Sequence, residues 1–333
     1  MQEKIKIGWI ETGKDLYGGH IYNASARDVI SKYTDLKTYF AQKKRCEYPL
    51  LSHFEIFKNL LLISDYQDFW IRDIVSLSTI GLDKTRGENI ALIHHDDFSG
   101  YPLWKRLPAR LLLHLTRKNI KKCKYIITVS KFWSEKYSSY GKEKVRIIYN
   151  PFKISDYNLS KSEVEEFLTK YQFSDKPIIY LGNCHKAKGI VEAYNALKEL
   201  DKDVNFVTSG YRNLILPVRH LQLSYKEYLQ LLKASTLVLT MSLFDEGWCR
   251  TAHEAMLLGT PVVGSGRGGM RELLEGGKQI ICEKFCDLKK IVTGILSSEE
   301  QRKELSSSGR IFAEQFSFER FEESWKELLN SLR

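Results

Sequence analysis

The sequence predicts an α/β protein with two lobes, each built around a doubly wound parallel sheet. Short apolar runs of strand length alternate with helix-length stretches along nearly the whole chain, which is the pattern of such sheets. One polar and charged stretch, residues 153–176, interrupts this alternation about halfway along. The length of 333 residues is sufficient for two hydrophobic cores. We therefore expect two Rossmann-like lobes, with the polar stretch carrying the chain from one to the other.

The composition is that of a folded protein, since 43% of the residues are apolar and 28% are charged. No apolar run reaches the roughly 18 residues that a membrane span requires. The amino-terminal residues lack the apolar core of a signal peptide. The six cysteines are scattered without the spacing of metal ligands, which indicates reduced thiols. We therefore expect a cytoplasmic protein.

In the first lobe, residues 1–152, a strand at residues 5–10 leads through a glycine-containing loop to a helix at residues 20–32. Gly18 and Gly19 in this loop let the backbone turn tightly and approach a ligand. The G-x-G-x-x-G fingerprint is absent, so a dinucleotide site is not supported. Further strands are expected at residues 36–40, 60–64, 89–93, 125–129 and 145–149.

His94 and His95 directly follow the expected strand at residues 89–93. Functional groups in open α/β sheets gather at the carboxyl ends of strands, so either histidine can hydrogen-bond a ligand hydroxyl or stabilise developing charge. A histidine pair satisfied by local hydrogen bonds is the alternative. Asp96 and Asp97 add metal-ligand types, but no partner spacing supports a metal site.

The second lobe, residues 153–315, shows the same alternation. Its first strand, residues 177–181, leads into a glycine-bounded turn that carries Lys186 and Lys188 and then into a helix at residues 190–200. A strand, such a turn and a helix form a phosphate-binding geometry, although the P-loop order is missing. Further strands are expected at residues 204–208, 218–221, 236–240, 261–264 and 279–282, and helices at 225–233, 250–258, 269–275, 286–296 and 298–315. Residues 316–333 are expected to form a last helix that packs back on the first lobe.

Two carboxylates, Glu246 and Glu254, stand eight positions apart around a Gly-Trp turn. A helix starting near residues 249–251 would direct its unpaired backbone N–H groups toward an anion such as a diphosphate. Glu246 would precede this helix and Glu254 would lie about one turn into it, so each carboxylate could hold one end of a ligand. The alternative is an ordinary loop and surface helix whose glutamates favour the helix N-terminus.

A basic segment at residues 101–131 dominates the net charge of +10. Nine lysines or arginines and no acidic residue lie between Phe98 and Ser134, interleaved with leucines. This is the profile of an amphipathic helix on an anionic bilayer. A solvated basic face over a core-packed helix is the alternative, and nucleic acid is the least supported partner because no recognition motif accompanies the charge.

Taken together, these motifs resemble the family-4 glycosyltransferases of the GT-B fold, in which two Rossmann-like lobes hold a nucleotide-sugar donor in the cleft between them. The resemblance is strongest over residues 178–275. Glu246 and Glu254 match the E-x7-E motif of the family. The surrounding matches are Gly247, Ala255, Met256, Gly259, Thr260, Pro261, Val262, Val263, Gly268, Gly269 and Glu272.

The resemblance implies a role for each matching residue. Glu246 would contact the hydroxyls of the donor hexose, Glu254 would bind the ribose, and Lys188 would neutralise the diphosphate leaving group. Asn183 stands where the family has an arginine, and Lys186, His185 or Arg250 would have to replace that charge. The other matches are Gly18 and Gly19 beside the sugar and phosphate, His94 or His95 at the reaction centre, Gly247, Trp248 and Cys249 as backbone that holds the sugar, and Arg250 and Thr251 facing the diphosphate.

The resemblance further implies retaining transfer without a metal cofactor. We expect a hexosyltransferase, with mannose as one candidate, that uses GDP-mannose or a UDP-hexose and acts on a glycan or lipid-linked acceptor at the inner membrane face. A GT-B epimerase or phosphorylase is an alternative, since it would use the same lobes. A non-catalytic nucleotide-sugar or glycan-binding protein is another, which Asn183 motivates.

Overall fold

The computed structural model describes residues 4–13, 18–42, 49–99 and 103–333, and these fold into two compact units. Unit 1 contains Met1–Phe98, Pro102–Pro151 and Phe318–Arg333, and unit 2 contains mainly Phe152–Ser317. The carboxyl-terminal helix α12 (Phe318–Asn330) thus belongs to the same unit as the amino-terminal strand.

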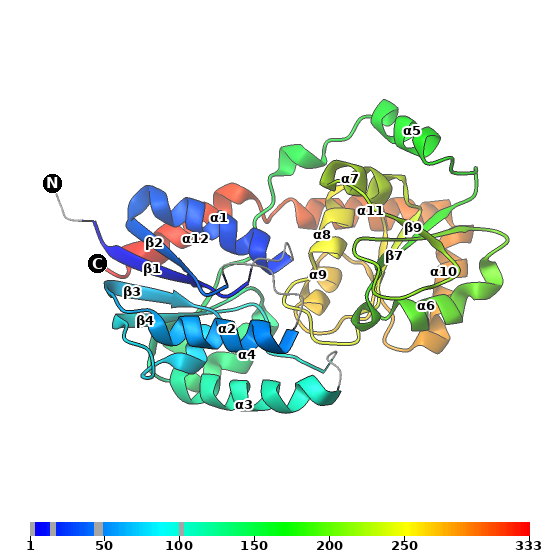
Figure 1. Ribbon diagram of the computed structural model, residues 1–333. Coiled ribbons are helices and arrows are strands. Elements are labelled where there is room, and N and C mark those ends of the chain that lie inside the picture. The colour runs from blue at the N-terminus through cyan, green and yellow to red at the C-terminus, as the bar shows by residue number, and fades with distance from the viewer. Residues whose placement is uncertain (1–3, 14–17, 43–48, 100–102) are drawn as a thin grey trace. The chain divides into compact units, whose positions relative to one another are not determined.

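Unit 1 is built around a parallel sheet of six strands in the order β2-β1-β3-β4-β5-β6 (Figure 1). Chain order reverses at β1 and β3, which are direct neighbours, and ligands of open α/β sheets bind at the carboxyl end of such a switch point. The strands are β1 (Lys6–Glu11), β2 (Asp35–Phe40), β3 (Tyr66–Arg72), β4 (Arg86–Ile93), β5 (Cys123–Thr128) and β6 (Val145–Ile147), and the helices are α1 (Gly18–Tyr33), α2 (Pro49–Leu62), α3 (Leu103–Ile120) and α4 (Lys131–Tyr137).

The strand expected at residues 60–64 is wrong. Helix α2 extends to Leu62, and the sheet strand is β3, which sequence reasoning missed. A short apolar run fits a buried strand or a helix end equally well by periodicity. Leu60 is 1% exposed and Leu62 67% exposed, so the two leucines lie on different faces of the helix. The polar Gln67 and Asp68 weaken the apolar signal of β3 itself.

Helix α12 packs against α1 through aromatic side chains, and Figure 1 shows the red helix beside the blue one. Trp325 is fully buried and lies 6.4 Å from Trp9, centroid to centroid. Phe321 meets Tyr22 edge to face at 5.2 Å. Each such side chain that is buried stabilises the folded protein by about 1.5–3 kcal/mol. This explains why the last residues of the chain fold with the first.

Unit 2 is built around a second parallel sheet of six strands, in the order β12-β11-β10-β7-β8-β9 (Figure 1). Here the switch point lies between β7 and β10. The strands are β7 (Ile178–Asn183), β8 (Asn205–Ser209), β9 (Arg219–Leu221), β10 (Leu237–Thr240), β11 (Val262–Gly264) and β12 (Ile280–Ile281). The helices are α5 (Lys161–Lys170), α6 (Ile190–Leu197), α7 (Tyr225–Ala234), α8 (Arg250–Leu257), α9 (Met270–Gly276), α10 (Phe285–Ser297) and α11 (Glu299–Ala313).

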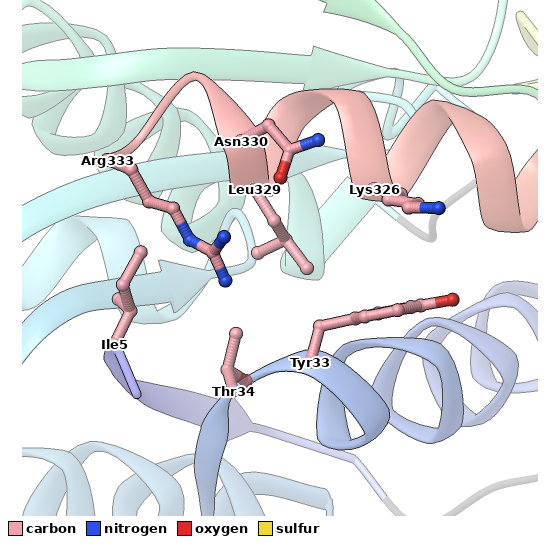
Figure 2. Close-up of a pocket in the computed structure, with 7 residues that line it drawn as sticks. All are labelled: Ile5, Tyr33, Thr34, Lys326, Leu329, Asn330 and Arg333. Atoms are coloured by element: carbon pink, nitrogen blue, oxygen red, sulfur yellow. The ribbon is translucent and has the colours of Figure 1, made fainter. Parts of the chain in front are cut away.

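A cavity of about 120 Å³ lies in unit 1 between the start of β1 and helix α12, as Figure 2 shows. Ile5 lines it just before the amino end of β1, and Tyr33 and Lys326 contribute from α1 and α12. Ligand sites of parallel sheets lie at the opposite, carboxyl ends of the strands. This cavity is therefore not the candidate site.

Among the described helices, none combines the length and apolar character that crossing a bilayer needs.

Candidate functional site

The switch point of the unit 2 sheet brings together residues that are far apart in the chain. The turn after β7 carries Lys188, and the loop after β10 carries Glu246. Because β7 and β10 are parallel neighbours, their carboxyl ends lie side by side. The Nζ atom of Lys188 is 2.5 Å from Oε1 of Glu246. Lys188 and Glu246, to which the resemblance assigns the diphosphate and the sugar, thus form an ion pair with each other.

The turn that carries Lys188 depends on Gly189. A short 3-10 segment, Lys186–Lys188, ends there, and Gly189 has φ +67°. A β-carbon at this position would come within 2.0 Å of the carbonyl oxygen of Met241, so only glycine lets the two segments approach. Helix α6 begins at Ile190. The turn thereby places Lys188 beside the loop that follows β10.

Glu246 is 7% exposed and is fixed from several sides. The hydroxyl of Ser242 donates a hydrogen bond to its Oε1. Its carbonyl oxygen accepts from the backbone N–H of Gly269 at 2.9 Å. A β-carbon on Gly268 would lie 2.4 Å from that carbonyl oxygen, which explains why the sequence has glycine there. The carboxylate therefore has a defined position before any ligand binds.

Lys188 remains charged in this environment. Burial lowers the pKa of its ammonium group, but the adjacent Glu246 carboxylate outweighs that effect, so the pKa lies above its usual value. His185 in the same turn behaves differently. Burial and the charge of Lys188 lower the pKa of the His185 imidazole, and its Nδ1 accepts a hydrogen bond from the N–H of Ala187 at 3.2 Å. His185 is thus a poor replacement for a missing arginine.

Asn183, at the end of β7, accepts a hydrogen bond from the Tyr180 hydroxyl at 3.0 Å. The side chain of Lys186 is exposed and forms no ion pair with any residue the structure describes. Arg250 is engaged elsewhere, since its NH2 lies 3.1 Å from Oε1 of Glu254 and its guanidinium lies over the Phe152 ring. Of the three replacements expected from the sequence, Lys186 is the uncommitted cation.

Helix α8 starts from a left-handed residue, because Cys249 has φ +72°. Trp248 and Cys249 are buried, and their side chains belong to the interior of unit 2. The indole N–H of Trp248 donates to Nδ1 of His253 at 2.9 Å, and Nε2 of His253 lies 3.0 Å from the Ala313 carbonyl oxygen. These contacts hold the turn at residues 247–249 from the interior of unit 2. Only its backbone is available to hold a ligand, as the resemblance implies.

Glu254 is 3% exposed and accepts several hydrogen bonds from protein donors. The hydroxyls of Tyr225 and Tyr228 donate at 3.1 Å each, in addition to Arg250. Thr251, on the same helix, has its Oγ1 atom 3.2 Å from the Tyr228 hydroxyl oxygen. A carboxylate has about four acceptor positions, so about one is left for a ribose hydroxyl. Sequence reasoning missed the two tyrosines, whose three-residue spacing on α7 indicates one face but not what that face meets.

In unit 1, His94 and His95 follow the carboxyl end of β4 and contact different neighbours. His94 lies against helix α1, where a β-carbon on Gly19 would be 3.4 Å from its Cδ2 atom. Gly18 opens that helix. His95 lies 6.4 Å from the Phe98 ring, centroid to centroid. His94 is therefore the histidine that adjoins the glycine pair, a choice that the sequence left open.

Asp96 is a structural residue of unit 1. Its carboxylate accepts from the Tyr137 hydroxyl at 2.9 Å, from Arg117 at 3.2 Å and from Lys136. The aspartate thus ties α3 and α4 to the end of β4. Within residues 4–13, 18–42, 49–99 and 103–333, no three His, Cys, Asp or Glu side chains gather as metal ligands would. Independence of a metal cofactor stays a prediction.

Comparison with known proteins places the molecule among its relatives. Residues 164–312 match the family described as glycosyl transferases group 1. An uncharacterized glycosyltransferase of Methanocaldococcus jannaschii is 25% identical over 283 residues, which cover 74% of this chain and 77% of that protein.

Two solved structures share the fold at low sequence identity. HepE of Anabaena, in complex with UDP-glucose, superimposes with a TM-score of 0.74 at 17% identity, covering 98% of this chain and 100% of that chain. Sucrose-phosphate synthase of Thermosynechococcus elongatus gives a TM-score of 0.77 at 14% identity, covering 98% of each chain. The fold with two Rossmann-like lobes is thus confirmed.

Proposed function

We propose that the chain is a group 1 glycosyltransferase that takes a nucleotide-sugar donor and transfers its hexose, with retention, to a glycan or lipid-linked acceptor. The observation that carries this proposal is the Lys188–Glu246 pair at the unit 2 switch point. A cation and a carboxylate in contact suit a ligand that joins an anionic diphosphate directly to a polyhydroxyl sugar.

The pair would divide the donor between its members. The Lys188 ammonium would stabilise the charge that develops on the departing nucleoside diphosphate. The Glu246 carboxylate would accept hydrogen bonds from hexose hydroxyls and orient the sugar. Lys186 would supply the second positive charge that Asn183 lacks. No metal ion is required in this scheme.

UDP-hexoses and GDP-mannose are the donors to test first. HepE binds UDP-glucose, which favours a UDP-hexose. Thermal stabilisation by UDP, GDP and their hexose conjugates would identify the base, because a ligand that binds only the folded state raises the melting temperature. Release of free UDP or GDP on addition of an acceptor extract would then report transfer. Binding without any release would favour a non-catalytic protein, and an isomerised free sugar would favour an epimerase.

Site variants connect the activity to the pair. Lys188→Ala and Glu246→Gln should each abolish transfer while the protein still unfolds cooperatively. Lys226→Ala is the matched control, since it removes an exposed ion pair with Glu163 elsewhere in unit 2. Full activity of both site variants would refute the assignment.

The lipid-linked character of the acceptor is supported by the exposed face of α3. Leu107 and Leu111 are 75% and 63% exposed and lie one turn apart. Arg110, His114 and Lys118 are exposed on the same helix, while Thr116 and other residues pack it against the unit. Exposed leucines among cations are typical of a helix that lies on an anionic bilayer. A helix that only covers a core would not expose them.

Vesicle sedimentation tests this surface. The protein should bind vesicles that contain phosphatidylglycerol more strongly than pure phosphatidylcholine vesicles. Leu107→Ser combined with Leu111→Ser should weaken that binding. Leu82→Ser is the control, because Leu82 is 61% exposed in unit 1 outside α3. Equal binding to neutral and anionic vesicles would count against the proposal.

A further inference from the structure

Buried polar side chains at the carboxyl end of the unit 1 sheet form a hydrogen-bonded cluster that has no role in the scheme above. Glu11 ends β1 and is 4% exposed, and Asn23 on α1 is 8% exposed. Asn23 lies between Glu11 and His94, which follows β4. The three side chains form one chain of hydrogen bonds across the switch point of the sheet.

Glu11 is a carboxylate that only accepts hydrogen bonds. Burial raises the pKa of Glu11, but the hydrogen bond from His20 and the charge of Arg27 outweigh it, and the pKa lies below its usual value. The contacts are direct, with Arg27 in an ion pair and Nδ1 of His20 at 3.3 Å. The indole N–H of Trp9 also donates to this carboxylate at 3.2 Å.

This charge decides how the Asn23 amide is oriented. Its Nδ2 lies 3.2 Å from Oε1 of Glu11, and an ionised carboxylate requires a donor at that position. The amide oxygen therefore faces His94, whose Nε2 lies 3.0 Å away. An amide oxygen can only accept, so Nε2 of His94 must carry the ring proton. Nδ1 is then the ring atom that can accept a hydrogen bond.

The ring of His94 is also held by its neighbours. The Tyr22 ring meets it edge to face with centroids 4.9 Å apart, and the Tyr22 hydroxyl donates to the Ile148 carbonyl oxygen at 3.1 Å. Gly19 at the start of α1 also lies beside the ring, since a β-carbon there would be 3.4 Å from its Cδ2 atom. Burial, together with the nearby His95, lowers the pKa of His94 to about 3, so the ring stays neutral near pH 7.

We propose that Asn23, oriented by Glu11, is a positioning residue that holds His94 in the Nε2–H tautomer and leaves Nδ1 to accept a hydrogen bond from a substrate hydroxyl at the carboxyl end of the unit 1 sheet. The inference rests on the proposed hexosyl transfer, since it assigns His94 to the reaction centre. It differs from an acid–base role, because a neutral ring of fixed tautomer only orients the hydroxyl. Tautomer control of this kind contributes strongly to catalysis when the wrong nitrogen would otherwise be protonated.

Nitrogen NMR of histidine-labelled protein tests the tautomer without any substrate. The His94 signals are assigned by their loss in His94→Gln. We expect Nε2 to be protonated and Nδ1 unprotonated at pH 7. In Asn23→Ala both tautomers should be populated, whereas Asn119→Ala, which removes a buried asparagine elsewhere in unit 1, should leave the Nε2–H form unchanged. A protonated Nδ1 in the wild type would overturn the proposal.

Kinetics then test the role in transfer. Asn23→Ala should lower kcat by roughly tenfold to a thousandfold while the donor KM changes little. Asn119→Ala is the matched control, because Asn119 is a buried asparagine of unit 1 that donates to the Leu77 carbonyl oxygen. It should lower the melting temperature and leave kcat unchanged. An unchanged kcat in Asn23→Ala would overturn the positioning role.

The two proposals fail in different ways. A wild-type protein that binds no nucleotide sugar would refute the proposed function, while the spectra alone would still decide the tautomer. If the wild type is active and its Asn23→Ala variant still has only the Nε2–H tautomer and an unchanged kcat, only the inference about Asn23 is refuted.

Discussion

Lys188 and Glu246 meet at 2.5 Å, Nζ to Oε1, although 58 positions of sequence separate them. The family resemblance assigns Lys188 to the diphosphate and Glu246 to the sugar, and the fold places the two side chains in direct contact. The two opposite charges neutralise each other in this pair. A donor that binds here has to offer negative charge to the lysine and hydroxyl donors to the glutamate at adjoining positions. The glycosidic linkage of a nucleotide sugar has this arrangement.

Removing either partner should affect catalysis more than binding. Lys188→Met leaves the developing diphosphate charge without its cation, and we expect kcat to fall by about 10² or more. Steady-state kinetics with the donor identified by thermal stabilisation would measure this. A variant with unchanged kcat and raised KM would show that Lys188 binds the ground state and the transition state equally, and would contradict a specific role in stabilising the leaving group.

Lys186 should contribute to diphosphate binding in place of the arginine missing at residue 183. Lys186→Ala should weaken nucleoside diphosphate affinity by roughly tenfold, because a charge-assisted hydrogen bond contributes about 1.5–3 kcal/mol. Lys202→Ala, another exposed lysine of unit 2, serves as the control. Calorimetric titration with UDP or GDP gives both values. Equal affinity in the two variants would show that a residue other than Lys186 supplies the second positive charge.

Glu254 should recognise the ribose through its remaining acceptor position. Glu254→Gln should weaken binding of the ribonucleotide by roughly tenfold and reduce its advantage over the 2′-deoxynucleotide. Glu275→Gln is the control, since Glu275 is exposed on α9 in the same unit. Affinity for both nucleotides would be compared by titration. An unchanged preference for ribose would assign its recognition elsewhere.

Stability should fall as the pH drops below about 6.5. Burial lowers the pKa of His253 to about 3, while in the unfolded chain it returns to about 6.5. The unfolded state therefore binds a proton that the folded state excludes, and stability present above pH 6.5 is lost progressively toward pH 3. For His253 alone the loss between pH 7 and pH 5 is about 2 kcal/mol. Urea unfolding of wild type and His253→Phe at both pH values would measure the difference, which should be smaller in the variant.

The exposed and the buried cysteines should differ in their rates of reaction with a thiol reagent. Cys286 is exposed, whereas burial raises the pKa values of Cys123 and Cys249 to about 12. Only the thiolate reacts, so at pH 8 a disulfide reagent should label Cys286 quickly and the two buried thiols only after unfolding. Mass spectrometry of labelled peptides would identify the sites. Rapid labelling of Cys249 in the folded protein would contradict the burial of the turn at residues 247–249.

Much of the fold could be predicted from local patterns. Alternating strand-length and helix-length segments indicated two parallel sheets, and both sheets are parallel throughout. The error at residues 60–64 arose where a short apolar run fits two structures equally well. The order of strands could not be read from the sequence, because it depends on which apolar faces pack together.

The candidate site divides in the same way. Glycines, lysines and paired glutamates at characteristic spacings predicted a phosphate-binding turn and a ligand site with two carboxylates, because local backbone geometry and charge are encoded in neighbouring residues. The resemblance to a known family then implied a nucleotide-sugar transferase. Contacts between distant residues were not predictable. The Lys188–Glu246 pair, the tyrosines on Glu254 and the link from Glu11 through Asn23 to His94 each join different elements. Only the packing of parallel strands, which brings their carboxyl ends to one edge, creates these contacts.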